Sequence, residues 1–209
     1  MSQIDDVLAV AEKEVGVHEQ GGNNRGPRVE EYLRAVGLPP GNPWCAAFVC
    51  WCLKQAGVKG GPCSGDTWAI EAWGKNHDCL YNETLHKPEA PKRGDIFLLL
   101  GSDNRPTHTG LVKAVNSDGT TIATIEGNTG LRSDTDGDGV ARKTRRIFDC
   151  SFVRWADVTD ASVARKAVKI FVHDGKRTIV VDEKTYLLDS LTVNGAAPTE
   201  VEIIERYSA

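Results

Sequence analysis

The sequence lacks the features that send a chain into or across a membrane. No apolar run approaches the roughly 20 residues that a membrane-spanning helix needs. The first ten residues, MSQIDDVLAV, contain aspartates where a secretory signal would have basic residues and then an apolar stretch. We therefore expect a chain that does not insert into membranes. We also expect it to be made in the cytoplasm without a signal peptide and to reach an external target by release or other means.

The sequence also lacks any concentration of charge of one sign. Its 209 residues include 25 Lys and Arg and 29 Asp and Glu, for a net charge of −4. The basic residues are scattered, which argues against nucleic acid or an anionic membrane surface as the main partner. A large neutral polymer, bound through sugar or peptide contacts, remains compatible with this pattern.

Cysteine is present, but not in the patterns that mark a metal site. The chain is long for a disulfide-stapled scaffold and shows no secretion signal, so free thiols are the expectation. Cys50 and Cys52 are too close in sequence for a zinc knuckle. The six cysteines are Cys45, Cys50, Cys52, Cys63, Cys79 and Cys150.

The first half of the chain has helical periodicity. One helix is predicted from Ile4 to Val15, with Ser2 and Asp5 as a capping pair. A second is predicted from Pro27 to Val36, and a short fourth covers residues 67–73. The third has the clearest signals, with Asn42 as N-cap, a proline in the first turn, one apolar stripe and a glycine at its end.

The second half changes to strand patterns. Residues 95–100 read as a strand buried on both faces, and residues 110–115 and 120–126 flank a hairpin turn at 116–119. Further strands are predicted around residues 140–148 and 152–155. Helices followed by an antiparallel sheet indicate an α+β fold. Residues 1–159 are predicted as the main domain, and residues 160–209 as a small β-rich accessory unit.

Cys45 has the position of an activated nucleophile. In the first turn of a helix, unpaired N–H groups and the helix dipole stabilise a thiolate. The same N–H groups can form part of an oxyanion hole. The alternative is an inert core cysteine on an apolar stripe, which is a common use of this residue.

His108 supplies a candidate base. It opens a strand directly after a polar loop, and the chain returns through Glu126 and Asn128. Alternation along a strand places Glu126 and Asn128 on one face, so either can orient the imidazole. The order of nucleophile, base and orienter suits nucleophilic catalysis. In the alternative interpretation, His108 is a solvated loop residue and Glu126 a surface charge.

These blocks resemble the CHAP family, the cysteine- and histidine-dependent amidohydrolases and peptidases. The resemblance covers roughly residues 5–155 and rests on six runs. The runs are residues 21–27, residues 31–33, residues 42–57 around the nucleophile, Arg93-Gly-Asp-Ile96, His108-Thr-Gly-Leu-Val112 and Ile125-Glu-Gly-Asn-Thr129. The sequence departs from the family pattern at Cys50, where a small residue is usual.

The resemblance implies a papain-like fold of the NlpC/CHAP type and cleavage of peptidoglycan or muropeptide amides. The bond is either the muramoyl–alanine amide or one within the peptides, and a phage-type endolysin fits such an enzyme. Cys45 is then the nucleophile, His108 the base and Glu126 the orienter, with Asn128 beside it. The alternatives are a non-catalytic wall-binding or virion structural module on the same scaffold, and an amidase or acyltransferase acting on another amide. The sequence does not indicate an oligomeric state.

A run of acidic residues is the remaining candidate for a ligand site. Asp134, Asp136 and Asp138 have the spacing of a calcium loop. The bidentate glutamate that such a loop needs, eleven residues after Asp134, is replaced by Arg145. A solvated acidic turn is therefore favoured over calcium, and no cofactor is expected.

Overall fold

The computed structural model describes residues 2–82, 89–130 and 137–158, and the backbone of residues 169–173, 176–181 and 184–188. The chain divides into two compact units, Met1–Thr159 and Asp160–Ala209, which are described separately below. Within the described residues, no helix combines the length and apolar character needed to cross a membrane.

Two of the four helices of the first unit begin at a residue whose side chain caps the helix. Ser2 and Asp5 form a capping box at the first helix. Asp66 accepts a hydrogen bond of 2.9 Å from the backbone N–H of Trp68 at the fourth. The helices are α1 (Gln3–Lys13), α2 (Pro27–Ala35), α3 (Cys45–Gln55) and α4 (Thr67–Asn76).

The third helix differs from the prediction in two ways. It begins at Cys45, with Trp44 as N-cap. Asn42 does not cap it, because the Asn42 side-chain amide donates to the carbonyl of Pro39 at 2.9 Å. The predicted single apolar stripe is also wrong, since every residue from Cys45 to Leu53 is buried. The helix is covered on all sides, because α1 and α2 pack on it and it packs in turn on the sheet.

The sheet of the first unit is antiparallel, with strand order β1-β6-β2-β3-β4-β5. Its strands are β1 (Leu80–Tyr81), β2 (Ile96–Leu100), β3 (Pro106–Val115), β4 (Thr121–Thr129), β5 (Gly139–Arg146) and β6 (Cys150–Val153). Short 3₁₀ turns follow β5 and β6, at Ile147–Asp149 and Trp155–Asp157. The predicted hairpin turn joins β3 to β4, and Gly119 has the positive φ of 65° that the turn requires. Helices packed on an antiparallel sheet confirm the predicted α+β fold.

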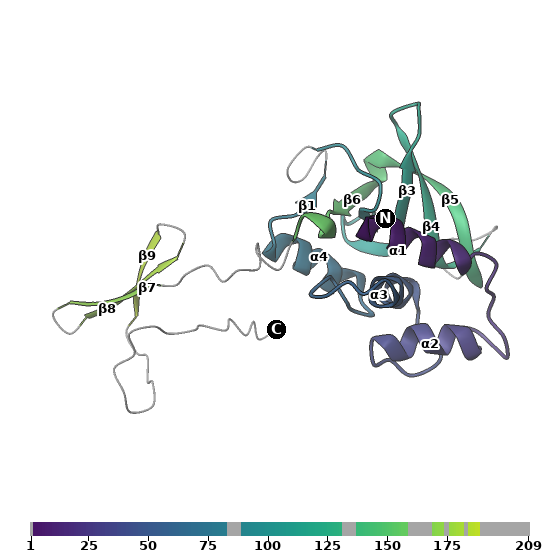
Figure 1. Cartoon of the computed structure of the whole chain (residues 1–209), viewed down its shortest axis with the longest axis horizontal. Helices are drawn as coiled ribbons and strands as arrows, with labels where there is room; N and C mark the ends of the chain where they lie inside the picture. The colour runs from purple at the N-terminus through teal and green to yellow at the C-terminus, as the bar shows by residue number, and fades with distance from the viewer. Residues whose placement is uncertain are drawn as a thin grey trace. The chain divides into compact units, whose positions relative to one another are not determined.

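The helix α3 joins the helical part of the unit to the sheet. It packs against β3 and β4, and α2 lies on its other side (Figure 1). Side chains of β2 are buried on both faces: Ile96 and Leu98 enter the core shared with the helices, and Phe97 enters a second core. The predicted doubly buried strand is therefore confirmed, and the sheet presents β3 and β4 directly to the start of α3.

One cysteine pair corrects the expectation of free thiols. A disulfide joins Cys50 on α3 to Cys63, with a Cα–Cα distance of 4.7 Å. The sequence pattern did not reveal it, because the pairing depends on the path of the connection after α3, which returns along the helix. Cys45, Cys52, Cys79 and Cys150 are free and buried.

The second unit contains a three-stranded antiparallel sheet, with order β7-β8-β9. Its strands are β7 (Lys169–His173), β8 (Lys176–Val181) and β9 (Lys184–Leu188). The predicted hairpin corresponds to β7 and β8, which pair in antiparallel register. The strand expected around residues 186–193 is found earlier, as β9. The strand expected around residues 201–204 lies outside the described residues.

Candidate active site

Cys45 is the first residue of α3, and 8% of its surface is exposed. The N-cap residue, Trp44, makes no side-chain capping hydrogen bond. The first N–H groups of a helix point out of its N-terminal end and lack partners within the helix. Together with the positive end of the helix dipole, they favour negative charge on sulfur or on an oxyanion beside it.

His108 faces this helix end from β3. It is the third residue of the strand, pairs with Leu99 across to β2, and is only 4% exposed. Its Nε2 lies 2.9 Å from Oε2 of Glu126, and the Cys45 side chain is close enough to the ring to influence the pKa of His108. With Nε2 directed to the carboxylate, Nδ1 is the nitrogen left to face the thiol. A solvated loop histidine and a surface glutamate are therefore excluded.

Glu126 is fully buried, and both of its oxygens accept hydrogen bonds. Oε1 accepts from the Thr124 hydroxyl at 2.5 Å and from Nε of Arg145 at 2.8 Å. Oε2 accepts from His108 and from Nη2 of Arg145. The carboxylate is thus fixed on both sides, and its charge is matched by a guanidinium in the two-pronged geometry that binds carboxylates best.

The pKa values of His108 and Glu126 move in opposite directions. Burial alone would lower the pKa of His108, but hydrogen bonds with Cys45 and Glu126 outweigh it and raise the pKa to about 9. Burial alone would raise the pKa of Glu126, but hydrogen bonds from Arg145 and His108 lower it to about 2. At neutral pH the site therefore favours an imidazolium paired with an ionised carboxylate.

Two glycines allow these elements to approach closely. A Cβ on Gly110, two residues after His108, would lie 2.7 Å from the Ile125 carbonyl oxygen and 2.9 Å from Cγ of Glu126. A Cβ on Gly127 would lie 2.6 Å from Cβ of Phe48 on α3. Real side chains do not pack at such distances. The glycines beside His108 and Glu126 are therefore required by packing.

Asn128 is close to the site in sequence but does not join the hydrogen-bond series. Its φ of 52° is left-handed, and the β4–β5 ladder shifts register between Glu126 and Thr129. This bulge interrupts the strict alternation that predicted one shared face for Glu126 and Asn128. Asn128 is 6% exposed, and its Oδ1 has no hydrogen-bond partner among the described residues. The carboxylate that contacts His108 is that of Glu126.

Arg145 and Thr124 are site residues that the sequence did not reveal. In the sequence, Arg145 stands where a calcium loop would have its glutamate, and no local pattern marks it as a partner of Glu126. Its side chain is 9% exposed and contacts Glu126. A signal was available in β5, where alternation places Arg145 on the less exposed face, opposite to Arg142 and Arg146, and a basic residue on such a face needs a partner.

Two residues of the candidate calcium loop, Asp134 and Asp136, lie outside the described residues. The backbone carbonyl of Asp138 accepts a hydrogen bond of 2.8 Å from the N–H of Glu19. No group of three or more His, Cys, Asp or Glu side chains suited to a metal occurs within the described ranges.

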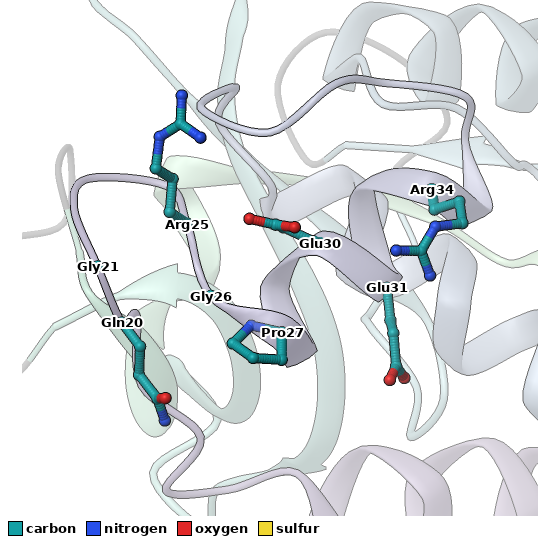
Figure 2. A pocket seen from close by; sticks show the side chains of 8 residues that line it. All are labelled: Gln20, Gly21, Arg25, Gly26, Pro27, Glu30, Glu31 and Arg34. Atoms are coloured by element: carbon teal, nitrogen blue, oxygen red, sulfur yellow. The ribbon is translucent and has the colours of Figure 1, made fainter.

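A surface hollow of about 590 Å³ lies elsewhere, over the N-terminal end of α2 and the loop before it (Figure 2). In the view of Figure 2, the Glu30 side chain lies between those of Arg25 and Arg34. The hollow contains none of the residues of the thiol–imidazole–carboxylate series, so its size does not mark it as the reaction centre. Its lining residues are Gln20, Gly21, Arg25, Gly26, Pro27, Glu30, Glu31 and Arg34.

A thiol at a helix N-terminus, followed by an imidazole and a carboxylate on a facing antiparallel sheet, is the arrangement of the papain-like cysteine hydrolases. Residues 37–128 match the model of the CHAP domain, which confirms the resemblance. The match contains Cys45, His108, Glu126 and Asn128 and ends before Arg145.

One solved structure is similar at low identity. It is described as "The crystal structure of Ly7917 with the hydrolyzing product of MDP". It is 13% identical, and the alignment covers 88% of this chain and 78% of that one, with a TM-score of 0.38. A search of curated proteins finds no match.

Proposed function

We propose that this protein is a cysteine-dependent peptidoglycan hydrolase that cleaves amide bonds, as a muramoyl–alanine amidase or a peptide endopeptidase. The series of Cys45, His108 and Glu126, inside the stretch that matches the CHAP model, carries this proposal. A wall-binding or structural module has no need for a buried imidazole between a thiol and an ionised carboxylate. The setting we propose is that of an endolysin, which acts on the wall after release from the cell that made it.

The proposed first step forms an acyl-enzyme. The Cys45 thiolate attacks the amide carbonyl carbon, and the free N–H groups at the start of α3 stabilise the oxyanion. The C–N bond then breaks, and the His108 imidazolium gives its proton to the departing nitrogen. The products of this step are a free amine and a thioester on Cys45.

The second step releases the acid. His108, now neutral, removes a proton from a water molecule, and the resulting oxygen nucleophile attacks the thioester. The C–S bond breaks, and the thiolate and imidazolium are restored. Glu126 stays ionised throughout, since its role is to orient the imidazole and stabilise its positive charge.

The test is mass spectrometry of peptidoglycan digested with the purified full-length chain. An amidase releases peptides with a free N-terminal alanine and leaves glycan strands with free lactyl carboxyl groups. An endopeptidase creates new amino termini within the stem or cross-bridge peptides. Cys45→Ala should abolish either product while the circular dichroism spectrum is unchanged, because only the thiolate can form the thioester.

Cys52→Ala is the matched control. Cys52 lies on the same helix, is fully buried, and is not part of the series, so its loss should leave the products unchanged. Binding of the folded wild-type chain to cell walls without any cleavage product would refute the enzyme and favour a wall-binding module. Equal turnover by Cys45→Ala and wild type would refute the assigned nucleophile.

A further inference from the structure

Arg145 lies on β5, beyond residues 37–128 that match the CHAP model. Its Nε donates to Oε1 of Glu126 at 2.8 Å, and its Nη2 donates to Oε2 at 2.5 Å. The Arg145 side chain is 9% exposed and Glu126 is fully buried, so this ion pair is screened very little by solvent.

We propose that Arg145 is a positioning residue of the catalytic unit, which keeps Glu126 ionised and fixes the plane of its carboxylate so that it orients His108. This inference rests on the proposed function, since it concerns the same reaction. A guanidinium binds both carboxylate oxygens at once, and this two-point contact prevents the carboxylate from rotating away from the imidazole.

The need for a cation follows from the burial of Glu126. A carboxyl group out of water takes up a proton more readily, and a protonated carboxyl cannot stabilise an imidazolium. The guanidinium of Arg145 opposes this protonation directly. Thr124 contributes one hydrogen bond on Oε1, but a hydroxyl carries no charge to offset that of the carboxylate.

The ionisable groups around this pair come from four elements in the described part of the chain. They are Cys45 on α3, His108 on β3, Arg145 on β5 and Cys150 on β6. Burial raises the pKa of the Cys150 thiol to about 12, so this group stays neutral near pH 7. Of the groups that face Glu126, Arg145 is therefore the permanent cation.

The test measures the thiolate without any substrate. The rate of Cys45 alkylation by iodoacetamide is followed against pH in full-length wild type and Arg145→Met, with Cys45→Ala as the blank. In Arg145→Met, Glu126 becomes protonated at a higher pH, so the imidazolium loses its partner earlier as the pH falls. The acid limb of the alkylation profile should move up by about one pH unit or more.

Hydrolysis provides the second readout. With muropeptide substrates, Arg145→Met should lower kcat on the order of ten- to a hundredfold while KM changes little, because the residue acts on the catalytic groups and not on substrate binding. Arg145→Lys keeps the charge without the two-point geometry, so it should restore part of both effects.

Arg142→Met is the matched control. Arg142 stands three residues earlier on β5, donates to Glu12 at 2.6 Å, and has a side chain that is 56% exposed. Its substitution should change neither the alkylation profile nor kcat. A general loss of β5 packing would instead lower the melting temperature and the activity of both variants.

A double-mutant cycle separates positioning from structural support. If Arg145 acts through Glu126, then adding Arg145→Met to the Glu126→Gln variant should lower kcat by no more than about twofold. An unchanged alkylation profile in Arg145→Met, or an equal loss of kcat in the wild-type and Glu126→Gln backgrounds, would overturn the inference.

If Arg145→Met does not fold, a wild-type profile in folded Arg145→Lys counts against two-point positioning, and an intermediate profile supports it. A shifted profile in a chain that cleaves no peptidoglycan would refute the proposed function alone.

Discussion

Glu126 and Glu14 are two buried carboxylates that the chain holds in nearly the same way. Each receives both prongs of an arginine and one hydroxyl. Glu14, at the end of α1, accepts from Nε and Nη2 of Arg28 at 2.7 and 2.6 Å and from the Tyr32 hydroxyl at 2.5 Å. Each is also close to a cysteine, since Cys52 lies within electrostatic range of Glu14.

The difference between them is the imidazole. Burial holds the pKa of Cys52 well above its ordinary value, and the described residues place no histidine on Glu14. The Glu14 cluster therefore ties α1 to α2, whereas the Glu126 cluster holds an imidazolium beside a thiol. A buried carboxylate–arginine pair is thus no sign of chemistry by itself, and the group placed between the carboxylate and the thiol decides its role.

The largest effect that this comparison predicts is the loss of turnover when the His108 imidazole is removed. His108→Ala should be as damaging to turnover as Cys45→Ala, because members of one catalytic unit are not additive. Tyr32→Phe removes the hydroxyl partner of Glu14 and should leave kcat unchanged. Initial rates of wall digestion by the two variants check this. Turnover near the wild-type level in a folded His108→Ala protein would show that another group is the base.

Substitution of the two carboxylates should affect different properties, with kcat lowered at Glu126 and stability lowered at Glu14. Glu126→Gln should lower kcat on the order of ten- to a thousandfold, because an amide orients the ring but cannot balance its charge. Glu14→Gln should lower the free energy of unfolding by about 1–3 kcal/mol and leave kcat unchanged. Steady-state kinetics and urea unfolding of both variants measure this. If Asn128→Ala proves far more damaging than Glu126→Gln, the orienting role belongs to Asn128.

The pH dependence of stability gives the Glu126 variant a second readout. The pKa of Glu126 in the folded chain, about 2, lies below its ordinary value of 4.5. The stabilisation it provides is therefore complete above pH 4.5 and is lost as the pH falls toward 2. Glu126→Gln should be less sensitive than wild type to acid across this range, as followed by circular dichroism at successive pH values.

The smallest effect on catalysis is expected at the disulfide. Cys50 lies on the nucleophile helix, five residues after Cys45, and its bond to Cys63 spans 13 residues of sequence. Cys63→Ser should lower the free energy of unfolding in non-reducing buffer by about 3 kcal/mol, with kcat unchanged. Reduced wild type should match the variant. A large loss of kcat would show that the disulfide also positions the thiol.

The residues predicted from the sequence are those whose signals are local. The capping pair at Ser2, the turn ending at Gly119, and the blocks around Cys45 and His108 each depend on a few neighbouring residues. The prediction of where α3 begins was wrong, because the Asn42 side chain does not cap the helix and donates instead to the Pro39 carbonyl.

Long-range features could not be predicted in this way. Arg145 reaches Glu126 only because of the β4–β5 register, which pairs Arg145 with Ile122 and Glu126 with Ala141. No periodicity in the sequence fixes that register to the residue. The Cys50–Cys63 bond depends likewise on the course of a connection that has no regular structure.

The close approach at Gly110 and Gly127 provides a criterion for sorting relatives of this chain. A sequence can retain the thiol, the imidazole and the carboxylate and still be inactive if the helix and the strand cannot meet. A larger residue at either glycine would collide with backbone or with Phe48 and push the nucleophile away from its base. Homologues with such a residue are candidates for pseudoenzymes that have kept the scaffold for binding. The residues at positions 110 and 127 distinguish them before any assay is run.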